Sequence, residues 1–289
     1  MNMDGCYRFQ VGDFECAVIN DGVELYPAND VIADVPQEQL EQALAARGFS
    51  PTEATVGYNC LLVDTGTPLA FGNSHSDGEQ YVLVDVGRGC GPPERDERLL
   101  QNLPVDPQDI DAVIVTHGDI DHVGGVIDAD GGLIFPNARH IMWKAGWEYW
   151  TSEASLAQMP ERTAAAKHKI IHLLRDRIEL VDAETEFMPG FRIVPATGHR
   201  PEHVTLDISS AGEQLLYLAD AIVHPIVIEY AEWQTAFHSF PEQAMQDKWR
   251  LIEQAATQNA LVLGFHFAFP GLGRVARRGQ GWHWQPIAT

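Results

Sequence analysis

Four residues of the types that bind metal ions lie close together directly after an apolar run of the chain. The run of residues 112–116 is followed by a short polar segment that contains His117, Asp119, Asp121 and His122. A lone His or Asp in a loop is usually a helix cap or a solvated side chain. Four such side chains in one short segment are instead typical of a metal site. We therefore predict that residues 117–122 bind metal.

Three further residues of the same types also follow apolar runs. They are His199 after residues 192–197, Asp220 after residues 215–219 and His266 after residues 261–264. Loops at strand ends, which a rigid sheet holds in place, are a common position for binding and catalytic side chains. We expect the metal site to lie at such a sheet edge.

The elements that must position these residues are strands mixed with helices along the whole chain. Continuous apolar runs are typical of strands covered on both faces, and amphipathic stretches are typical of surface helices. The predicted strands are residues 58–64, 81–85, 112–116, 140–143, 192–196, 204–208, 215–219 and 260–264. The predicted helices are residues 93–103, 160–177 and 241–257. This mixture predicts an α/β architecture with sheets inside and helices outside.

Length and charge limit the classes of partner. With 289 residues, 45% of them hydrophobic, the chain can form a single domain over residues 1–289, built from two fused αβ halves. The 41 acidic and 19 basic residues give a formal net charge of −22. So acidic a surface repels phosphate backbones and anionic lipid heads, which argues against nucleic acid and membrane partners. A homodimer is compatible with the sequence.

The cell compartment is expected to be the cytoplasm. The first residues lack a basic stretch followed by an apolar run, so we expect no signal peptide. Uncharged apolar stretches stay shorter than the ~20 residues that a membrane span needs. The four cysteines have no paired short spacing and are expected to be buried or free thiols.

Taken in order, the motifs resemble the metallo-β-lactamase superfamily. Its signature is His-x-His-x-Asp-His, then a distant Gly-His, an Asp after a strand and a final His. Residues 117–122, Gly198-His199, Asp220 and His266 follow that order, and the resemblance spans about residues 57–270. Residues 264–271 and the Gly-Trp-His-Trp stretch at 281–284 resemble the branch of methyl parathion hydrolase and N-acyl-homoserine lactonases.

The resemblance implies an αββα sandwich with two divalent metal ions at the sheet edge. By motif position, His117, Asp119 and His199 would hold one metal, whereas Asp121, His122 and His266 would hold the other, with Asp220 bridging the two. Asp85 is expected to hold the N–H group of a ligand imidazole, as metal-bound His usually requires, and His203 to support the ligands in the same way.

Asp119 departs from the family pattern, which has His at this position. Three ligand carboxylates and a bridging hydroxide would balance the charge of two divalent ions, so the site should be a weaker Lewis acid. Zinc is the metal we expect, but an oxygen ligand favours iron or manganese at the Asp119 site. Alternatively, Asp119 points away and only the second site fills.

The implied activity is hydrolysis of an ester, lactone or phosphotriester by a metal-activated hydroxide. The catalytic candidates are Asp220, which holds the metals together, and Asp121, which orients the hydroxide or relays a proton. A small neutral or apolar substrate is expected, because aromatic residues flank the ligand loops and basic residues are scarce beside them. Candidates for its pocket are Trp143, Trp147, His224, Phe267 and Phe269.

Three alternatives remain open. A β-lactamase or a thioesterase shares the same site. A nuclease is disfavoured by the net charge of −22. An iron-dependent oxidoreductase of the same fold could use His117, Asp119 and His199 as a two-histidine, one-carboxylate triad.

Overall fold

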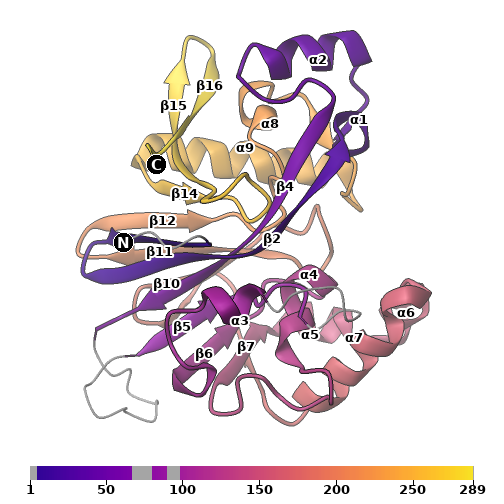
Figure 1. Cartoon of the computed structure of the whole chain (residues 1–289), viewed down its shortest axis with the longest axis vertical. Helices are drawn as coiled ribbons and strands as arrows, with labels where there is room; N and C mark the ends of the chain where they lie inside the picture. Colours follow the sequence, from indigo (N-terminus) through magenta and orange to yellow (C-terminus); the bar gives the residue numbers. More distant parts are fainter. Residues whose placement is uncertain (1–4, 67–79, 90–97, 289) are drawn as a thin grey trace.

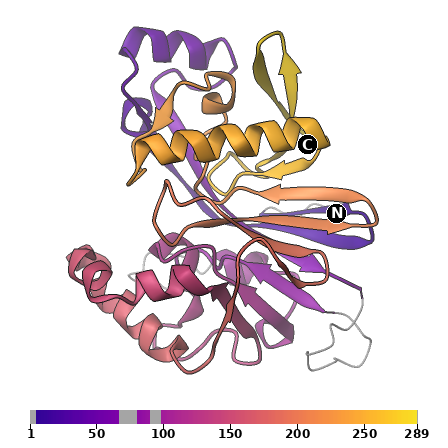
Figure 2. The same cartoon turned by 180° about the vertical axis from the view of Figure 1, so that it is seen from behind.

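Two seven-stranded sheets lie face to face, and helices cover their outer sides (Figure 1 and Figure 2). The computed structural model describes residues 5–66, 80–89 and 98–288. In the two views, α9 (Pro241–Gln258) lies on one outer side, whereas α5 (Lys144–Trp150) and α7 (Glu161–Leu174) lie on the other. The α/β class and the αββα layering expected from the sequence are therefore confirmed.

The first sheet is antiparallel over its N-terminal strands and parallel from β5 onward. Its strands, in spatial order, are β1 (Cys6–Val11), β2 (Phe14–Pro27), β4 (Glu53–Asp64), β5 (Tyr81–Val84), β6 (Ile110–Ile114), β7 (Arg139–Trp143) and β8 (Ile178–Val181).

The second sheet is antiparallel except where β12 pairs with β14. Its strands, in spatial order, are β16 (Gly281–Pro286), β15 (Leu272–Arg278), β14 (Leu261–Leu263), β12 (Glu213–Tyr217), β11 (Val204–Ser210), β10 (Phe191–Pro195) and β9 (Glu186–Met188). A separate small pair joins β3 (Ile32–Ala33) to β13 (Gln234–Thr235).

The remaining helices are short. They are α1 (Ala28–Val31), α2 (Gln37–Ala45), α3 (Arg98–Asn102), α4 (Ile120–Val123), α6 (Glu153–Gln158) and α8 (Ile226–Glu229), with 3₁₀ turns at Pro107–Asp109 and Gly124–Val126. The longest of the described helices, α9, begins with Pro241 at its first turn and ends at Gln258. The next residue, Asn259, has a φ of 49° and caps the helix in a left-handed conformation.

The strands predicted from the sequence all occur, with ends shifted by a few residues. The predicted helices 160–177 and 241–257 correspond to α7 and α9. Of the predicted helix 93–103, the structure shows α3 within it, and residues 93–97 lie outside the described residues. Cys90 also lies outside them, whereas Cys6, Cys16 and Cys60 are buried free thiols, as expected. No described helix is long and apolar enough to cross a membrane.

The segment 117–122 continues into a helix, because α4 begins at Ile120. Gly124 and Gly125 follow this helix directly. The two glycines lie in the next turn, where the backbone of residues 86–88 approaches closely. A Cβ at Gly124 would lie 2.3 Å from the carbonyl oxygen of Arg88, and one at Gly125 would lie 2.0 Å from that of Val86. Glycine therefore permits contact between two loops of the site.

Candidate metal centre

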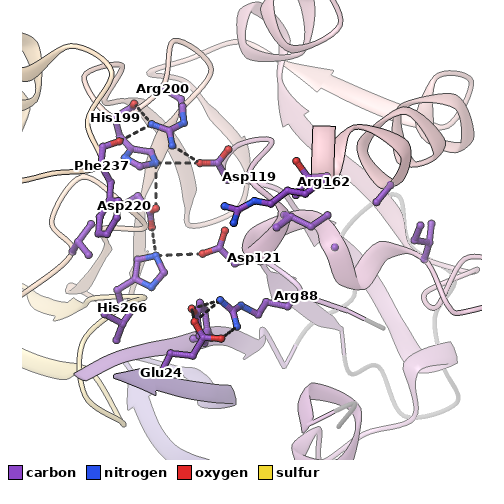
Figure 3. A pocket seen from close by; sticks show the side chains of 18 of the residues that line it. Glu24, Arg88, Asp119, Asp121, Arg162, His199, Arg200, Asp220, Phe237 and His266 are labelled. Carbon is purple, nitrogen blue, oxygen red and sulfur yellow. Dashed lines mark hydrogen bonds and ion pairs between the residues drawn. The ribbon is translucent and has the colours of Figure 1, made fainter. Parts of the chain in front are cut away.

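Asp220 lies between four imidazole rings, two on the side of each carboxylate oxygen. Its Oδ2 is 3.2 Å from Nε2 of His199 and 3.8 Å from Nε2 of His117. Its Oδ1 is 3.0 Å from Nε2 of His122 and 3.1 Å from Nε2 of His266. The line from His199 through Asp220 to His266 can be followed in Figure 3. One carboxylate therefore faces two separate groups of nitrogen donors.

The two predicted ligand groups are each gathered in space. The donor atoms within each group lie within 4.8 Å of one another. One group is His117, Asp119 and His199, and the other is Asp121, His122 and His266. The structure thus brings together all seven residues that the sequence analysis assigned to metal binding, with Asp220 between the groups.

The donor set fits a pair of metal ions. Nε2 of His117, of His122 and of His199 is buried without a hydrogen-bond partner, as is Oδ1 of Asp220. Buried polar atoms without partners are costly, and native proteins rarely tolerate several in one place. Divalent metal ions would satisfy these atoms, because imidazole nitrogen and carboxylate oxygen are their usual ligands.

Asp85 fixes the orientation of His122. Its Oδ2 accepts a hydrogen bond of 2.7 Å from Nδ1 of His122, so the Nε2 lone pair of this ring faces the centre. The fully buried Asp85 also accepts hydrogen bonds from the hydroxyl groups of Thr116 and Tyr217. Asp85 therefore lies where the sequence analysis expects it, holding the imidazole of His122, one of the predicted ligands.

His203 positions the backbone of Asp220. Its Nδ1 donates to the carbonyl oxygen of Ala196 at 2.9 Å, and its Nε2 accepts from the backbone N–H of Asp220 at 3.0 Å. The residue before Asp220, Ala219, has a φ of 43°, and Asp85 has a φ of 55°. Left-handed conformations of residues other than glycine are strained and tend to cluster at functional sites. Two carboxylates of the centre are therefore held at or beside strained positions.

The charges of the centre attract positive charge. The carboxylates of Asp220, Asp85 and Asp121 raise the pKa of His122 well above its usual value, although burial of the ring acts in the opposite direction. Burial, with the nearby His122, lowers the pKa of His117 to about 4. The pKa of Asp220 is held well below its usual value by the surrounding histidines, although burial acts against this. Asp220 is therefore a carboxylate ready to accept a cation.

A sequence model of the metallo-beta-lactamase superfamily matches residues 57–257, which is more than half of the chain. The chain belongs to the metallo-beta-lactamase superfamily. The family that the motifs resemble is thereby confirmed, and the expectation of a metal-dependent hydrolase agrees with this family and with the donor set.

Several solved structures of similar fold cover the whole length of this superfamily member. AidC, described as a dizinc quorum-quenching lactonase in complex with a product, is 23% identical, with a TM-score of 0.85 over 99% of this chain and 98% of that chain. The hydrolase AbOPH is 21% identical, with a TM-score of 0.82 over 100% and 99%. A probable metal-dependent hydrolase from Staphylococcus aureus is 20% identical, with a TM-score of 0.77 over 97% and 99%. No curated protein matches the chain in sequence.

Asp119 points into the centre of this superfamily member and is held by two cations that the sequence analysis missed. Its Oδ2 is 2.9 Å from Nη2 of Arg200, and its Oδ1 is 3.2 Å from Nζ of Lys167. The same Oδ2 lies 3.5 Å from Nε2 of His199, so the carboxylate stays beside the donors (Figure 3). Although burial acts in the opposite direction, His117, His199 and Arg200 hold the pKa of Asp119 well below its usual value. The alternative that Asp119 points away is therefore wrong.

The metal centre opens into a cavity of about 820 Å³ that is rich in basic side chains. Four of them line it: Arg88, Arg162, Lys169 and Arg200. The premise that basic residues are scarce beside the ligand loops is therefore wrong. The sequence did not reveal these basic residues because Arg88, Arg162 and Lys169 lie far from the predicted ligands along the chain. Only Arg200 adjoins a predicted ligand, His199, and it was the one sequence signal for a cation at the site.

The five residues predicted to form the substrate pocket lie elsewhere, since none is among the described residues that line this cavity. Trp147 and Phe267 are buried in the core, where Phe267 packs edge-on against Trp284. The buried His224 packs against Phe49 instead. The remaining two are Trp143, which is half-buried against the core, and Phe269, which is 38% exposed.

Two tryptophans of α5 pack against the segment 117–122. Trp150 is 1% exposed, and a Cβ at Gly118 would lie 2.1 Å from its Nε1. Trp147 packs edge-on against Trp150, with 5.7 Å between ring centroids. These rings therefore set the path of the chain between His117 and Asp119 rather than forming a wall of the cavity.

Proposed function

We propose that this chain is a hydrolase of carboxylic esters and lactones, with phosphotriesters as a further class, and that it depends on two divalent metal ions. The observation that carries the proposal is the position of Asp220, whose two oxygens face the two groups of metal donors. The similarity of fold to the lactonase AidC supports the proposal that the bond cleaved is that of an ester or a lactone.

The first metal group would be formed by His117, Asp119 and His199, and the second by Asp121, His122 and His266. We propose zinc at the second group and zinc, iron or manganese at the first, because an oxygen ligand favours harder metals. When bound, the metal pair would acidify a water molecule and polarise the bond that is attacked.

Residues of the chain itself do the positioning. Asp121 lines the cavity, and its Oδ2 lies 3.5 Å from Nε2 of His266. Its carboxylate is placed to orient a water molecule or to accept a proton as the bond is broken. Asp220 holds the two donor groups together, and Asp85 and His203 hold the ligands in place through the hydrogen bonds described above.

A test is the hydrolysis of a substrate panel by variants of the bridging residue. Asp220→Ala and His122→Ala should lower the hydrolysis of a chromogenic aryl ester and an acyl-homoserine lactone by at least about a hundredfold. Asp176→Asn and His172→Gln, at exposed positions, are the matched controls. Full activity of either site variant would overturn the two-metal hydrolase. A thioester, a β-lactam and a phosphotriester in the same panel would show whether the protein cleaves one of these bonds instead.

An iron-dependent oxidoreductase is the second candidate, because His117, Asp119 and His199 form one group with two nitrogen donors and one oxygen donor. Oxygen consumption by the iron-loaded protein with a thiol or persulfide substrate, together with inactivity on every ester, would favour it. The cytoplasmic location and the homodimer stay predictions.

A further inference from the structure

One face of α7 forms a wall of the cavity beside the metal centre. Its lining residues are Arg162, Thr163, Ala165, Ala166 and Lys169. Positions seven residues apart lie on the same side of a helix, so Arg162 and Lys169 face the cavity together. The alanines between them are small and leave the space between the two cationic groups open.

Arg162 and Lys169 lack an ion-pair partner among the described residues, unlike the other two cations that line the cavity. Arg88 is paired with Glu24, and Arg200 is paired with Asp119. In the part of the chain that the structure describes, no ion pair or side-chain hydrogen bond involves Arg162 or Lys169. Figure 3 shows the guanidinium group of Arg162 directed toward the space between Asp119 and Asp121, the two carboxylates on the cavity side of the centre.

The charge of the loaded cavity is positive. Five carboxylates line it, together with the four basic side chains named above; they belong to Glu24, Asp119, Asp121, Asp128 and Asp220. Two divalent ions and their bridging hydroxide would add three positive charges, which gives the loaded cavity a net charge of about +2. This occurs in a chain whose formal net charge is −22. The cavity is thus a positive region within an otherwise acidic molecule and would attract anions from solution.

We propose that the substrate of this site carries an anionic group, a carboxylate or a phosphate-like group, which Arg162 binds with help from Lys169 while the scissile ester lies at the metal centre. This inference rests on the proposed hydrolase function and names its substrate class. A planar guanidinium group suits this task, because it binds carboxylate and phosphate oxygens through two parallel hydrogen bonds. Lys169 contributes a point charge farther along the same helix face.

A series of three 4-nitrophenyl esters tests the proposal on the metal-loaded protein. They are the esters of glutaric acid, of 4-phosphonobutyric acid and of glutaric acid monoamide, which differ only in a terminal carboxylate, phosphonate or neutral amide. The protein should prefer at least one charged ester over the amide by about tenfold in kcat/KM. The more favoured charged ester identifies the anion. Added salt should raise KM for the charged esters only.

Arg162→Gln should remove that preference by raising KM for the charged esters about tenfold, with the amide ester changed less than about twofold. Arg162→Lys should keep part of it, because the charge remains. Arg175→Gln is the matched control, since Arg175 is an exposed residue at the end of the same helix and is not among the described residues lining the cavity. It should leave all three rates unchanged.

Equal rates for the three esters, or equal losses for charged and neutral esters in Arg162→Gln, would overturn the inference while leaving the hydrolase in place. If no ester is cleaved, the proposed function fails, and calorimetric binding of glutarate decides the inference alone. Glutarate should then bind Arg162→Gln about tenfold more weakly than Arg175→Gln, and equal binding constants would overturn it.

Discussion

Nη2 of Arg200 lies 2.9 Å from Oδ2 of Asp119, which places a fixed positive charge on the one carboxylate that replaces the family's usual histidine. Lys167 contacts the other oxygen of Asp119 at 3.2 Å. The neutral metal pair expected from counting ligand charges therefore does not describe this site, because the added charge of Asp119 is offset by two adjacent cations. The site regains the positive character that a histidine ligand would give it.

The first prediction concerns this ion-pair group. In the metal-free protein, Asp119→Asn should lower the free energy of unfolding by about 1–3 kcal/mol, because it leaves the largely buried Lys167 without its counter-charge. Adding Lys167→Met should restore part of that loss. Urea unfolding of both variants measures it, with Asp128→Asn as a cavity-lining control. A double variant as unstable as Asp119→Asn would show that Lys167 is not the cause.

A second prediction concerns the hydrogen bond that orients His122. Asp85→Asn should weaken metal binding by about 10–100-fold, because the ring loses the carboxylate that holds its Nδ1–H. Tyr217→Phe removes only one hydrogen bond to Asp85 and should have a smaller effect. Competition with a chromophoric chelator measures both affinities. Unchanged affinity in Asp85→Asn would show that this contact does not support the metal.

The third prediction tests the packing of the metal-binding segment on α5. Gly118→Ala places a Cβ against the ring of Trp150 and should lower the free energy of unfolding by about 1–3 kcal/mol. It should also reduce the metal content, since His117 and Asp119 flank this position. Gly281→Ala meets only one atom, at 3.9 Å, and serves as the control. Equal stability of the two variants would mean that the segment can move away from Trp150 at little cost.

The fourth prediction is a pH dependence that arises outside the metal centre. Burial lowers the pKa of His224 from 6.5 to about 4. Between these values the unfolded chain takes up a proton that the folded protein does not, so stability falls as the pH drops through this range.

In His224→Gln, the loss of unfolding free energy between pH 7 and pH 4.5 should be about 2–3 kcal/mol smaller than in the unaltered protein. Urea titrations of the metal-free proteins at the two pH values measure it. His172→Gln, at an exposed position, should leave the difference unchanged. The same acid sensitivity in all three proteins would assign the effect to other groups.

The predicted metal-binding residues could be found from the sequence because they lie a few residues beyond strand ends. The segment 117–122 follows β6 of the first sheet, and His199, Asp220 and His266 follow β10, β12 and β14 of the second. The residues that line the cavity could not be predicted in this way. Phe267 adjoins the predicted ligand His266 in sequence, but its side chain turns into the core. Arg162 has no ligand near it in sequence, and only the packing of α7 against the loop after β6 brings it to the site. Sequence proximity therefore identified donors, whereas the substrate-facing surface depends on how distant elements pack.

The N-terminal strands show a similar limit. β1 and the outer part of β2 alternate between partly buried and exposed residues and lack the continuous apolar runs that marked the central strands. Which side chains of α7 turn inward was also not apparent from the sequence. Lys167 and Lys169 flank the exposed His168, yet Lys167 is buried against Asp119. A residue pattern alone does not show which of several charged neighbours turns inward.

The most direct test of the central claim is the hydrolysis of a 4-nitrophenyl ester while zinc or manganese is titrated into the metal-free protein. The proposed two-metal hydrolase should show no turnover without metal and a rise in rate that ends at two equivalents per chain. Full activity without metal, or a plateau at one equivalent, would contradict it.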